Sequence, residues 1–463
     1  MTAMPTDGST LLGHVLAGVA RRSVPVSEGL PLGPWGARPD QRAVGVSGDI
    51  TVTALALCDV DTAETVILVT ADVTEWPREL AGRIRERITD ATGVARAGIL
   101  ICATHTHSSL PLDDAYLLPW DPTGDGARCR EQLVQSTIES AIASVESMES
   151  AEVKVIRRPC RVARSRRQIV EGRRVVGVAE VANEATVDVV ALNRADGSVI
   201  ASAVIYGCHP TTLGWQHMMF SPDWPGGVRD VLEEALSAPC LVFQGCGADR
   251  APAFGFSGRQ DDADLVGRAI GHVCLGAILE EAQADLVITT HGVVESGAPL
   301  AVTKAASAES PGPCSVSART IHLTPPLRAR DPDRAAVTVA AARQRFEAGE
   351  LGAAAQIQQG SIELEICRRF PPSGDDSVEI TLVSIGALTV LAWPGELSGG
   401  VQELFERQAT ASPFVVITNV NDFVGYMPTE TQFAEGGYEA DSSPFTSEAP
   451  GWVAQRIATE IWP

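Results

Sequence analysis

Two histidines stand two residues apart directly after an apolar run. Residues 98–103 (GILICA) are continuous and apolar, as is typical of a buried strand, and His105 and His107 follow in the segment THTHS. Side chains two apart on an extended chain project to the same face, so we expect both imidazoles at the end of this strand. The pair suits metal binding or catalysis. The structural alternative is two imidazoles held by the neighbouring hydroxyl groups.

A third histidine follows a second apolar run. Residues 199–206 predict a strand, and His209 comes just after it in the segment CHPTT. The following Pro210 favours an extended conformation of His209, which restricts the direction of its side chain. Two histidine-bearing strand ends in one chain favour a metal site over unrelated structural histidines.

A glutamate and two tyrosines complete the set of candidate residues. Glu396 follows an apolar run and a Pro-Gly turn, and Tyr426 and Tyr438 are two of only four tyrosines in the chain. Taken singly, Glu396 suits the start of a helix and the tyrosines suit rings that pack a loop. Combined with the histidines, they give a nitrogen and oxygen ligand set suited to Zn²⁺.

The composition limits the classes of partner. The chain of 463 residues has a net charge of −22, which disfavours nucleic acid and anionic membranes. None of its apolar runs approaches the roughly 20 residues of a membrane helix. The first 22 residues do not resemble a signal peptide, and the ten cysteines show no CxxC pair. We therefore expect a cytoplasmic protein with reduced cysteines.

The pattern of apolar runs predicts an α/β fold. Continuous apolar strands alternate with amphipathic helices, which indicates a mixed β-sheet core covered by helices. No long linker or repeat divides the chain, so we expect a single catalytic domain over residues 1–463. The predicted strands include residues 65–71, 98–103, 187–193, 199–206, 240–244, 361–366, 378–385 and 387–392, and the predicted helices include residues 76–93, 227–236, 261–284 and 334–349.

Five segments in this order resemble motifs of the neutral/alkaline (non-lysosomal) ceramidase family. The resemblance runs from about Gly18 to the C-terminus. The segments are THTHS (104–108), CHPTT (208–212) with SPDWPG (221–226), ADRAP (248–252), PGE (394–396) and GYMPT with GGYE (425–439). The chain ends soon after the last motif, so we expect only the catalytic domain of that family, without its C-terminal immunoglobulin-like domain.

The resemblance implies a role for each candidate residue. Zinc is held in that family by residues that correspond here to His105, His209, Glu396 and Tyr426. The residues that act on the substrate carbonyl correspond to His107, Tyr438 and an arginine, for which Arg164 is the best match and Arg166 the competitor. The arginine motif lacks its flanking Asn and Pro here, and Ala248 and Ala251 replace a glycine and a serine of the family.

The resemblance also implies the reaction. We expect a zinc-dependent amidohydrolase that uses metal-activated water to cleave the N-acyl bond of a small molecule other than ceramide. The same site can serve ester or lactone hydrolysis, or acyl transfer and cyclisation, and a non-catalytic binding protein on the same scaffold is a further alternative. Three aspartates near the motifs, Asp72, Asp223 and Asp249, are expected to support the site, with a carboxylate orienting His105 or His209.

Overall fold

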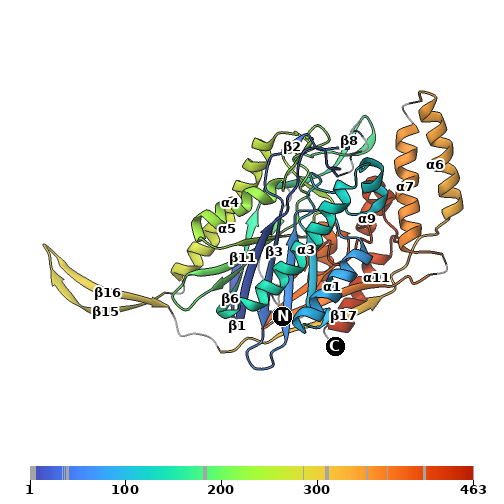
Figure 1. Cartoon of the computed structure of the whole chain (residues 1–463). Helices are drawn as coiled ribbons and strands as arrows, with labels where there is room; N and C mark the ends of the chain where they lie inside the picture. The colour runs from blue at the N-terminus through green and yellow to red at the C-terminus, as the bar shows by residue number, and fades with distance from the viewer. Residues whose placement is uncertain are drawn as a thin grey trace.

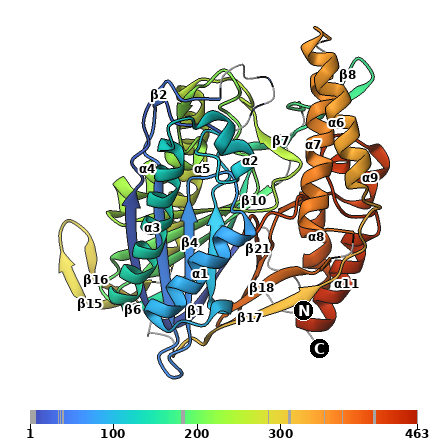
Figure 2. The ribbon, with the colours of Figure 1, turned by 45° about the vertical axis from the view of Figure 1, so that its right-hand side comes forward.

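Two β-sheets packed face to face form the centre of the protein, and helices cover the outer face of each sheet (Figure 1 and Figure 2). This computed structural model describes residues 7–33, 35, 37, 41–180, 185–284, 286–307, 312–350, 353–372, 374–409 and 413–461. The prediction of an α/β fold with a mixed sheet covered by helices is confirmed.

The larger sheet has eight strands of mixed direction. Strands β4 and β5 are parallel, as are β11 and β13, and the remaining pairs are antiparallel. In sheet order the strands are β13 (Cys240–Gln244), β11 (Val199–Tyr206), β10 (Ala185–Asn193), β6 (Glu149–Cys160), β1 (Gly8–Ser23), β3 (Thr51–Cys58), β4 (Thr65–Ala71) and β5 (Ile99–Ala103). Most of these strands are buried on both faces, which explains why their sequences are continuously apolar.

The smaller sheet packs on the inner face of the larger one. Val383, Val390 and Val415 of the smaller sheet share one core with Leu57 and Val153 of the larger. The strands of the smaller sheet, in order, are β17 (Val316–Leu323), β18 (Val378–Ile385), β19 (Leu388–Ala392) and β21 (Phe414–Ile417). Short two-stranded ribbons complete the β structure: β2 (Gly45–Val46) with β12 (Met219–Phe220), β7 (Ala163–Ser165) with β14 (Arg250–Pro252), β8 (Arg167–Val170) with β9 (Arg173–Val176), β15 (Leu286–Glu295) with β16 (Pro299–Ser307), and β20 (Glu396–Leu397) with β22 (Tyr426–Met427).

The helices cover the outer faces of both sheets. Apolar residues of α1, α3, α4 and α5 pack on the larger sheet, and those of α8 and α11 pack on the smaller one. The helices are α1 (Arg78–Thr92), α2 (Asp114–Leu117), α3 (Asp125–Glu146), α4 (Trp224–Leu236), α5 (Gln260–Ala284), α6 (Pro332–Glu347), α7 (Ala353–Arg369), α8 (Gly399–Gln408), α9 (Glu430–Glu435), α10 (Tyr438–Asp441) and α11 (Ala449–Ile461). Among the described residues, none of these helices combines the length and apolar character needed to cross a bilayer.

Helix α1 illustrates why the amphipathic pattern was informative. Its buried residues Leu80, Ile84 and Ile88 recur every four positions and face the sheet, as their spacing predicts. Gly93 ends the helix in a left-handed conformation with φ of 75°, and its N–H donates to the carbonyl of Thr89.

One predicted strand is wrong. Residues 361–366 (SIELEI) alternate polar and apolar side chains and were expected to form a strand, but they lie within α7. Glutamate and leucine are strong helix formers, and α7 pairs with α6 as a helical hairpin at one end of the molecule (Figure 1). Helix propensity and this partner therefore outweigh the short alternating pattern.

A short segment joins the two edges of the larger sheet. This seam segment, residues 418–421, follows β21 and lies between the ends of β13 and β5. Thr418 N donates to the carbonyl of Gln244 in β13 at 2.8 Å, and Asn421 N donates to the carbonyl of Ile101 in β5 at 2.9 Å. Asn419 and Asn421 have φ angles of 57° and 63°, a conformation that asparagine adopts more readily than most residues. The carboxyl ends of β5 and of the β11–β13 pair are thereby held together.

Candidate metal centre

Three backbone segments position the candidate ligands at these strand ends. His105 follows β5, and its N–H donates to the carbonyl of Val73 at 2.9 Å. Its φ of 71° lies in the left-handed region, which residues other than glycine adopt uncommonly. His209 follows β11, and its N–H donates to the carbonyl of Arg250 at 3.0 Å. Glu396 begins β20, the short strand between β19 and α8.

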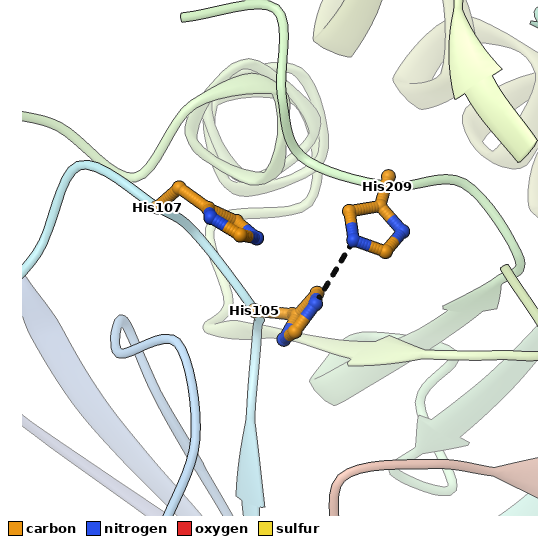
Figure 3. A group of neighbouring side chains, drawn as sticks. All are labelled: His105, His107 and His209. Carbon is orange, nitrogen blue, oxygen red and sulfur yellow. Dashed lines mark hydrogen bonds between the residues drawn. The ribbon is translucent and has the colours of Figure 1, made fainter. Parts of the chain in front are cut away.

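The donor atoms of these three side chains converge. The two Nε2 atoms of His105 and His209 lie 3.1 Å apart, as the dashed line in Figure 3 marks. The carboxylate of Glu396 lies 3.3 Å from His105 Nε2 through Oε1 and 3.5 Å from His209 Nε2 through Oε2. All three residues are buried, with 1–2% of each exposed. Residues separated by nearly 300 positions in the sequence therefore meet at one point.

The other ring nitrogen of each histidine, Nδ1, forms a hydrogen bond with a backbone carbonyl. His105 Nδ1 lies 2.6 Å from the carbonyl of Thr74, and His209 Nδ1 lies 3.1 Å from the carbonyl of Gly247. A carbonyl oxygen only accepts, so each Nδ1 carries a proton, and in the neutral form of either ring Nε2 presents a lone pair. Burial, and then the charge of Arg166, lowers the pKa of His209 well below its usual range, which keeps this ring neutral.

With both rings neutral, the three groups present acceptor atoms to one another. Both carboxylate oxygens of Glu396 are buried and have no hydrogen-bond donor in the described part of the chain. Buried acceptors without donors are costly unless a cation satisfies them. Ligand atoms bound to one tetrahedral zinc are about 3.3–3.4 Å apart, given bonds of about 2.0–2.1 Å. The observed spacings of 3.1, 3.3 and 3.5 Å fit a single cation of this kind.

His107 lies beside this cluster. Its ring centroid is 5.0 Å from that of His105 and 5.6 Å from that of His209, and the three rings share one space in Figure 3. One ring nitrogen from each of the three histidines falls within 4.8 Å of the others, so the trio can hold a metal ion. The expectation that the paired histidines emerge together at the strand end agrees with this arrangement.

Tyr426 and Tyr438 form the far side of the site. Tyr426 pairs with Glu396 in the parallel β20–β22 ribbon, and its ring centroid lies 5.6 Å from that of Tyr438. Burial, followed by the charge of Glu396, raises the pKa of Tyr426 well above its usual value. Burial likewise raises the pKa of Tyr438. Both hydroxyl groups are therefore protonated at neutral pH unless a cation binds them.

The structure brings Arg166, and not Arg164, to this cluster. The guanidinium carbon of Arg166 lies 5.6 Å from the centroid of the Tyr426 ring, and Arg166 is 3% exposed. Although burial acts to lower the pKa of Arg166, the neighbouring acidic groups, Tyr426 first, raise it on balance. Arg164 instead donates to the carbonyl of Glu180 near the surface. The missing flanking residues of the motif explain why the two arginines were hard to separate in the sequence.

The aspartates near the motifs do not touch the ring nitrogens of His105 or His209. The expectation that a carboxylate orients one of these histidines is wrong, because the carbonyls at the strand ends already fill that role. Asp72 instead accepts two hydrogen bonds of 2.9 Å from Arg229, and Asp223 caps the start of α4. Asp249 accepts from the N–H of Gly399 and the side chain of Gln432.

Two features of the site were not predicted. Glu439, the last residue of the GGYE motif, is buried and accepts from Arg166 Nε at 2.9 Å. It therefore holds Arg166 next to the segment that carries Tyr438. The GGYE motif includes Glu439, but its role in positioning Arg166 becomes visible only in the folded structure.

The second unpredicted feature is an aromatic wall made of Trp35, Trp215 and Phe256. The Trp35 ring lies 5.2 Å from that of His107 and 5.7 Å from that of Phe256, and Trp215 lies 6.5 Å from Trp35. Trp215 is 38% exposed, so the wall extends from His107 toward solvent. These aromatic residues are far apart in the sequence and belong to no motif, so they gave no signal there.

Comparison with known proteins identifies the fold. The sequence matches no protein-family model and no curated protein. The structure matches the crystal structure of neutral ceramidase from Pseudomonas aeruginosa and a structure of ceramidase complexed with C2. Each match has a TM-score of 0.66 at 13% sequence identity and covers 96% of this chain and 74% of the solved chain. At this identity the matches show the fold alone, and the protein has the fold of neutral ceramidase.

Proposed function

We propose that this protein is a zinc-dependent hydrolase that cleaves an amide bond of a small molecule. His105, His209, Glu396 and Tyr426 would hold the metal. Bound zinc supplies a Lewis acid that activates water and polarises a carbonyl group. A ceramidase fold supports an amide as the bond that is cleaved.

One observation carries this proposal. Two imidazole Nε2 atoms and one carboxylate approach one another to 3.1–3.5 Å, and neither carboxylate oxygen has a hydrogen-bond donor among the described residues. A structural cluster would be expected to alternate donors and acceptors, because unmatched buried acceptors destabilise the fold. A cation shared by all three groups removes this cost.

The chain's own groups provide the remaining chemistry. Arg166 and the Tyr438 hydroxyl are donors near the centre and would stabilise negative charge on the carbonyl oxygen. This proposal gives Arg166 the role that the motif comparison gave first to Arg164. His107 would transfer a proton to the leaving amine, since it lies beside the ligands and is half-buried.

The aromatic wall supports an apolar group on the substrate. Trp35 packs against His107, so a substrate group that rests on the wall would place its amide beside this histidine. Aromatic rings bind apolar and planar groups through burial and ring contacts. The wall therefore favours an N-acyl compound with an apolar or aromatic portion.

Metal analysis tests the proposal directly. Purified full-length protein should contain about one zinc per chain, measured by mass spectrometry of the metal after dialysis. His105→Ala, His209→Ala and Glu396→Gln should each lose the metal, whereas His322→Ala, on the exposed face of β17, should retain it. Turnover should then be measured on a panel of N-acyl compounds and matched esters.

The outcomes separate the parts of the proposal. If metal content survives both histidine substitutions, the metal centre is assigned incorrectly. Hydrolysis of esters alone, with metal bound as expected, would contradict the amide assignment but leave the metal centre intact. Metal binding without turnover on any acyl compound would contradict the catalytic function.

A further inference from the structure

A two-stranded arm extends away from the body of the protein. Among the described residues, strands β15 and β16 pair only with each other, and Figure 1 shows the arm (yellow) projecting beyond the two sheets. Every described side chain of residues 287–306 is exposed. An isolated two-stranded ribbon is marginally stable in water at best, so a covering partner would stabilise this one.

The arm is apolar on both of its faces. The cross-strand register places Val294 directly opposite Leu300, with Val302 on the same face, and places Ile288 and Val293 on the other face. These five residues are 46–64% exposed. Exposed apolar residues scattered singly are normal, but a cluster on one element marks an interaction surface.

The arm also lacks the charge of the rest of the chain. Residues 286–307 contain one acidic residue, Glu295, and one lysine, Lys304, whereas the whole chain has a net charge of −22. Two copies of such an acidic protein repel each other over most of their surfaces. A neutral, apolar arm is a surface on which two copies can meet without that repulsion.

A second exposed stripe lies on α5, the helix that leads into the arm. Leucine, alanine, histidine and glycine stand there at the seven-residue spacing of a helix–helix contact. The stripe consists of Leu265, Ala269, His272, Gly276 and Leu279, all of them exposed. Alanine and glycine allow close approach, and a Cβ atom added to Gly276 would meet no atom within 4 Å beyond the nearby backbone of its own helix. Helix α5 ends at Ala284 and the arm begins at Leu286, so the two surfaces adjoin.

We propose that this protein forms a two-fold symmetric homodimer in which the arm of each copy packs on the other copy beside α5. A standard protein interface uses roughly 20–30 residues from each partner. Residues 286–307 alone approach this size, and the α5 stripe adds to it. Two-fold dimers are the commonest symmetric assemblies, and reciprocal arms would bury both apolar faces of each ribbon. This inference is independent of the proposed metal centre.

Sedimentation of the full-length chain tests the proposal. Wild-type protein at micromolar concentration should sediment with twice the chain mass of 48.8 kDa. Val294→Glu with Leu300→Glu should raise the dissociation constant roughly a hundredfold or more, because this directly opposed pair would carry two charges into the predicted contact. The control Val337→Glu makes the same chemical change on α6, where Val337 is 70% exposed, and should leave the dimer unchanged.

An arm-deleted variant provides a second test. Leu286 and Ser307 are direct cross-strand partners, so an Asn-Gly turn in place of residues 287–306 should close the chain without disturbing the body. This variant should be monomeric, with unchanged zinc content and circular dichroism of the body. In wild-type protein, hydrogen exchange of the arm amides should slow as protein concentration rises.

Three results would overturn the proposal. The first is a wild-type protein that sediments as a monomer at all concentrations. The second is an arm-deleted variant that dimerises as tightly as the wild type. The third is a monomer whose arm binds phosphatidylcholine vesicles, which would make a lipid surface the occupant instead of a second copy.

Discussion

Glu396 and Tyr426 are direct partners in a parallel ribbon of only two residues on each strand. The backbone pairing fixes the two side chains side by side although thirty positions separate them in the sequence. This pairing keeps a carboxylate and a phenol close together, as two ligands of one cation would require. The ribbon therefore prepares two of the four proposed ligands before the metal arrives.

Removing the Tyr426 hydroxyl should weaken metal binding. Tyr426→Phe keeps the buried ring and its contact with Tyr438, so the fold should be retained. We expect zinc affinity to fall roughly tenfold to a hundredfold, the loss typical of groups that tune a metal site. Competition with a chromophoric chelator measures this change. Tyr116→Phe, which removes a hydroxyl that bonds to Glu365, should leave zinc affinity unchanged.

Arg166 and Arg164 should differ in their effect on turnover. Arg166→Lys keeps the positive charge but loses the planar geometry, so kcat/KM should fall about a hundredfold, as for the loss of one oxyanion donor. Zinc content should not change. Arg164→Lys is the matched control and should have wild-type kinetics, since Arg164 points to the carbonyl of Glu180. Equal effects of the two substitutions would contradict the assignment.

The buried ion pair between Asp72 and Arg229 should stabilise the fold. Asp72→Asn leaves the Arg229 guanidinium buried beside a neutral group, and breaking such a pair typically costs about 3–5 kcal/mol. Urea denaturation measures this loss in the free energy of unfolding. Arg345→Gln breaks the exposed pair with Glu350, which solvent screens, and should change stability far less. A similar cost for both variants would contradict the importance of burial.

Asp223 should make stability depend on pH in an unusual direction. Burial raises the pKa of Asp223 to about 6, so between pH 4 and 6 the folded protein keeps a proton that the unfolded chain releases. The raised pKa of Asp223 therefore adds to the free energy of unfolding at low pH. This stabilisation, up to about 3 kcal/mol, is lost as the pH rises through 6. Asp223→Asn cannot ionise and should lack this dependence.

The measurement for Asp223 is the difference in unfolding free energy between wild type and Asp223→Asn. Other titrating groups cancel in this difference. It should favour the wild type more at pH 4.5 than at pH 7.5. A difference that is constant, or that grows with pH, would show that the carboxyl group ionises as readily in the fold as in the unfolded chain.

The sequence predicted the strands next to the site better than it predicted how the strands are arranged in the sheet. Residues 65–71 form β4 as predicted, and His105 and His209 follow strands as predicted, because continuous apolar runs reflect burial on both faces. The central strand β1 was not predicted. Its sequence mixes glycine, histidine and arginine with apolar residues, and its position in the middle of the sheet depends on long-range pairing with β3 and β6.

Long-range contacts also determine which arginine reaches the site, a choice that the motifs left open. Arg166 reaches Tyr426 because Glu439 accepts from its Nε, a contact between residues more than 270 positions apart. No local pattern contains that information. The aromatic wall depends in the same way on three separate loops, so its residues could be recognised only once the chain was folded.

The seam segment affects the order in which the protein folds and acquires its metal in the cell. The proposed ligands span residues 105 to 426, and residues 418–421 close the larger sheet only after most of the chain exists. Domains generally fold as units, so a domain is completed only when all of its segments have been synthesised. A nascent chain still attached to the ribosome would therefore carry His105 and His209 without their remaining partners. Metal insertion would be one of the last events of maturation, after translation has delivered the C-terminal residues.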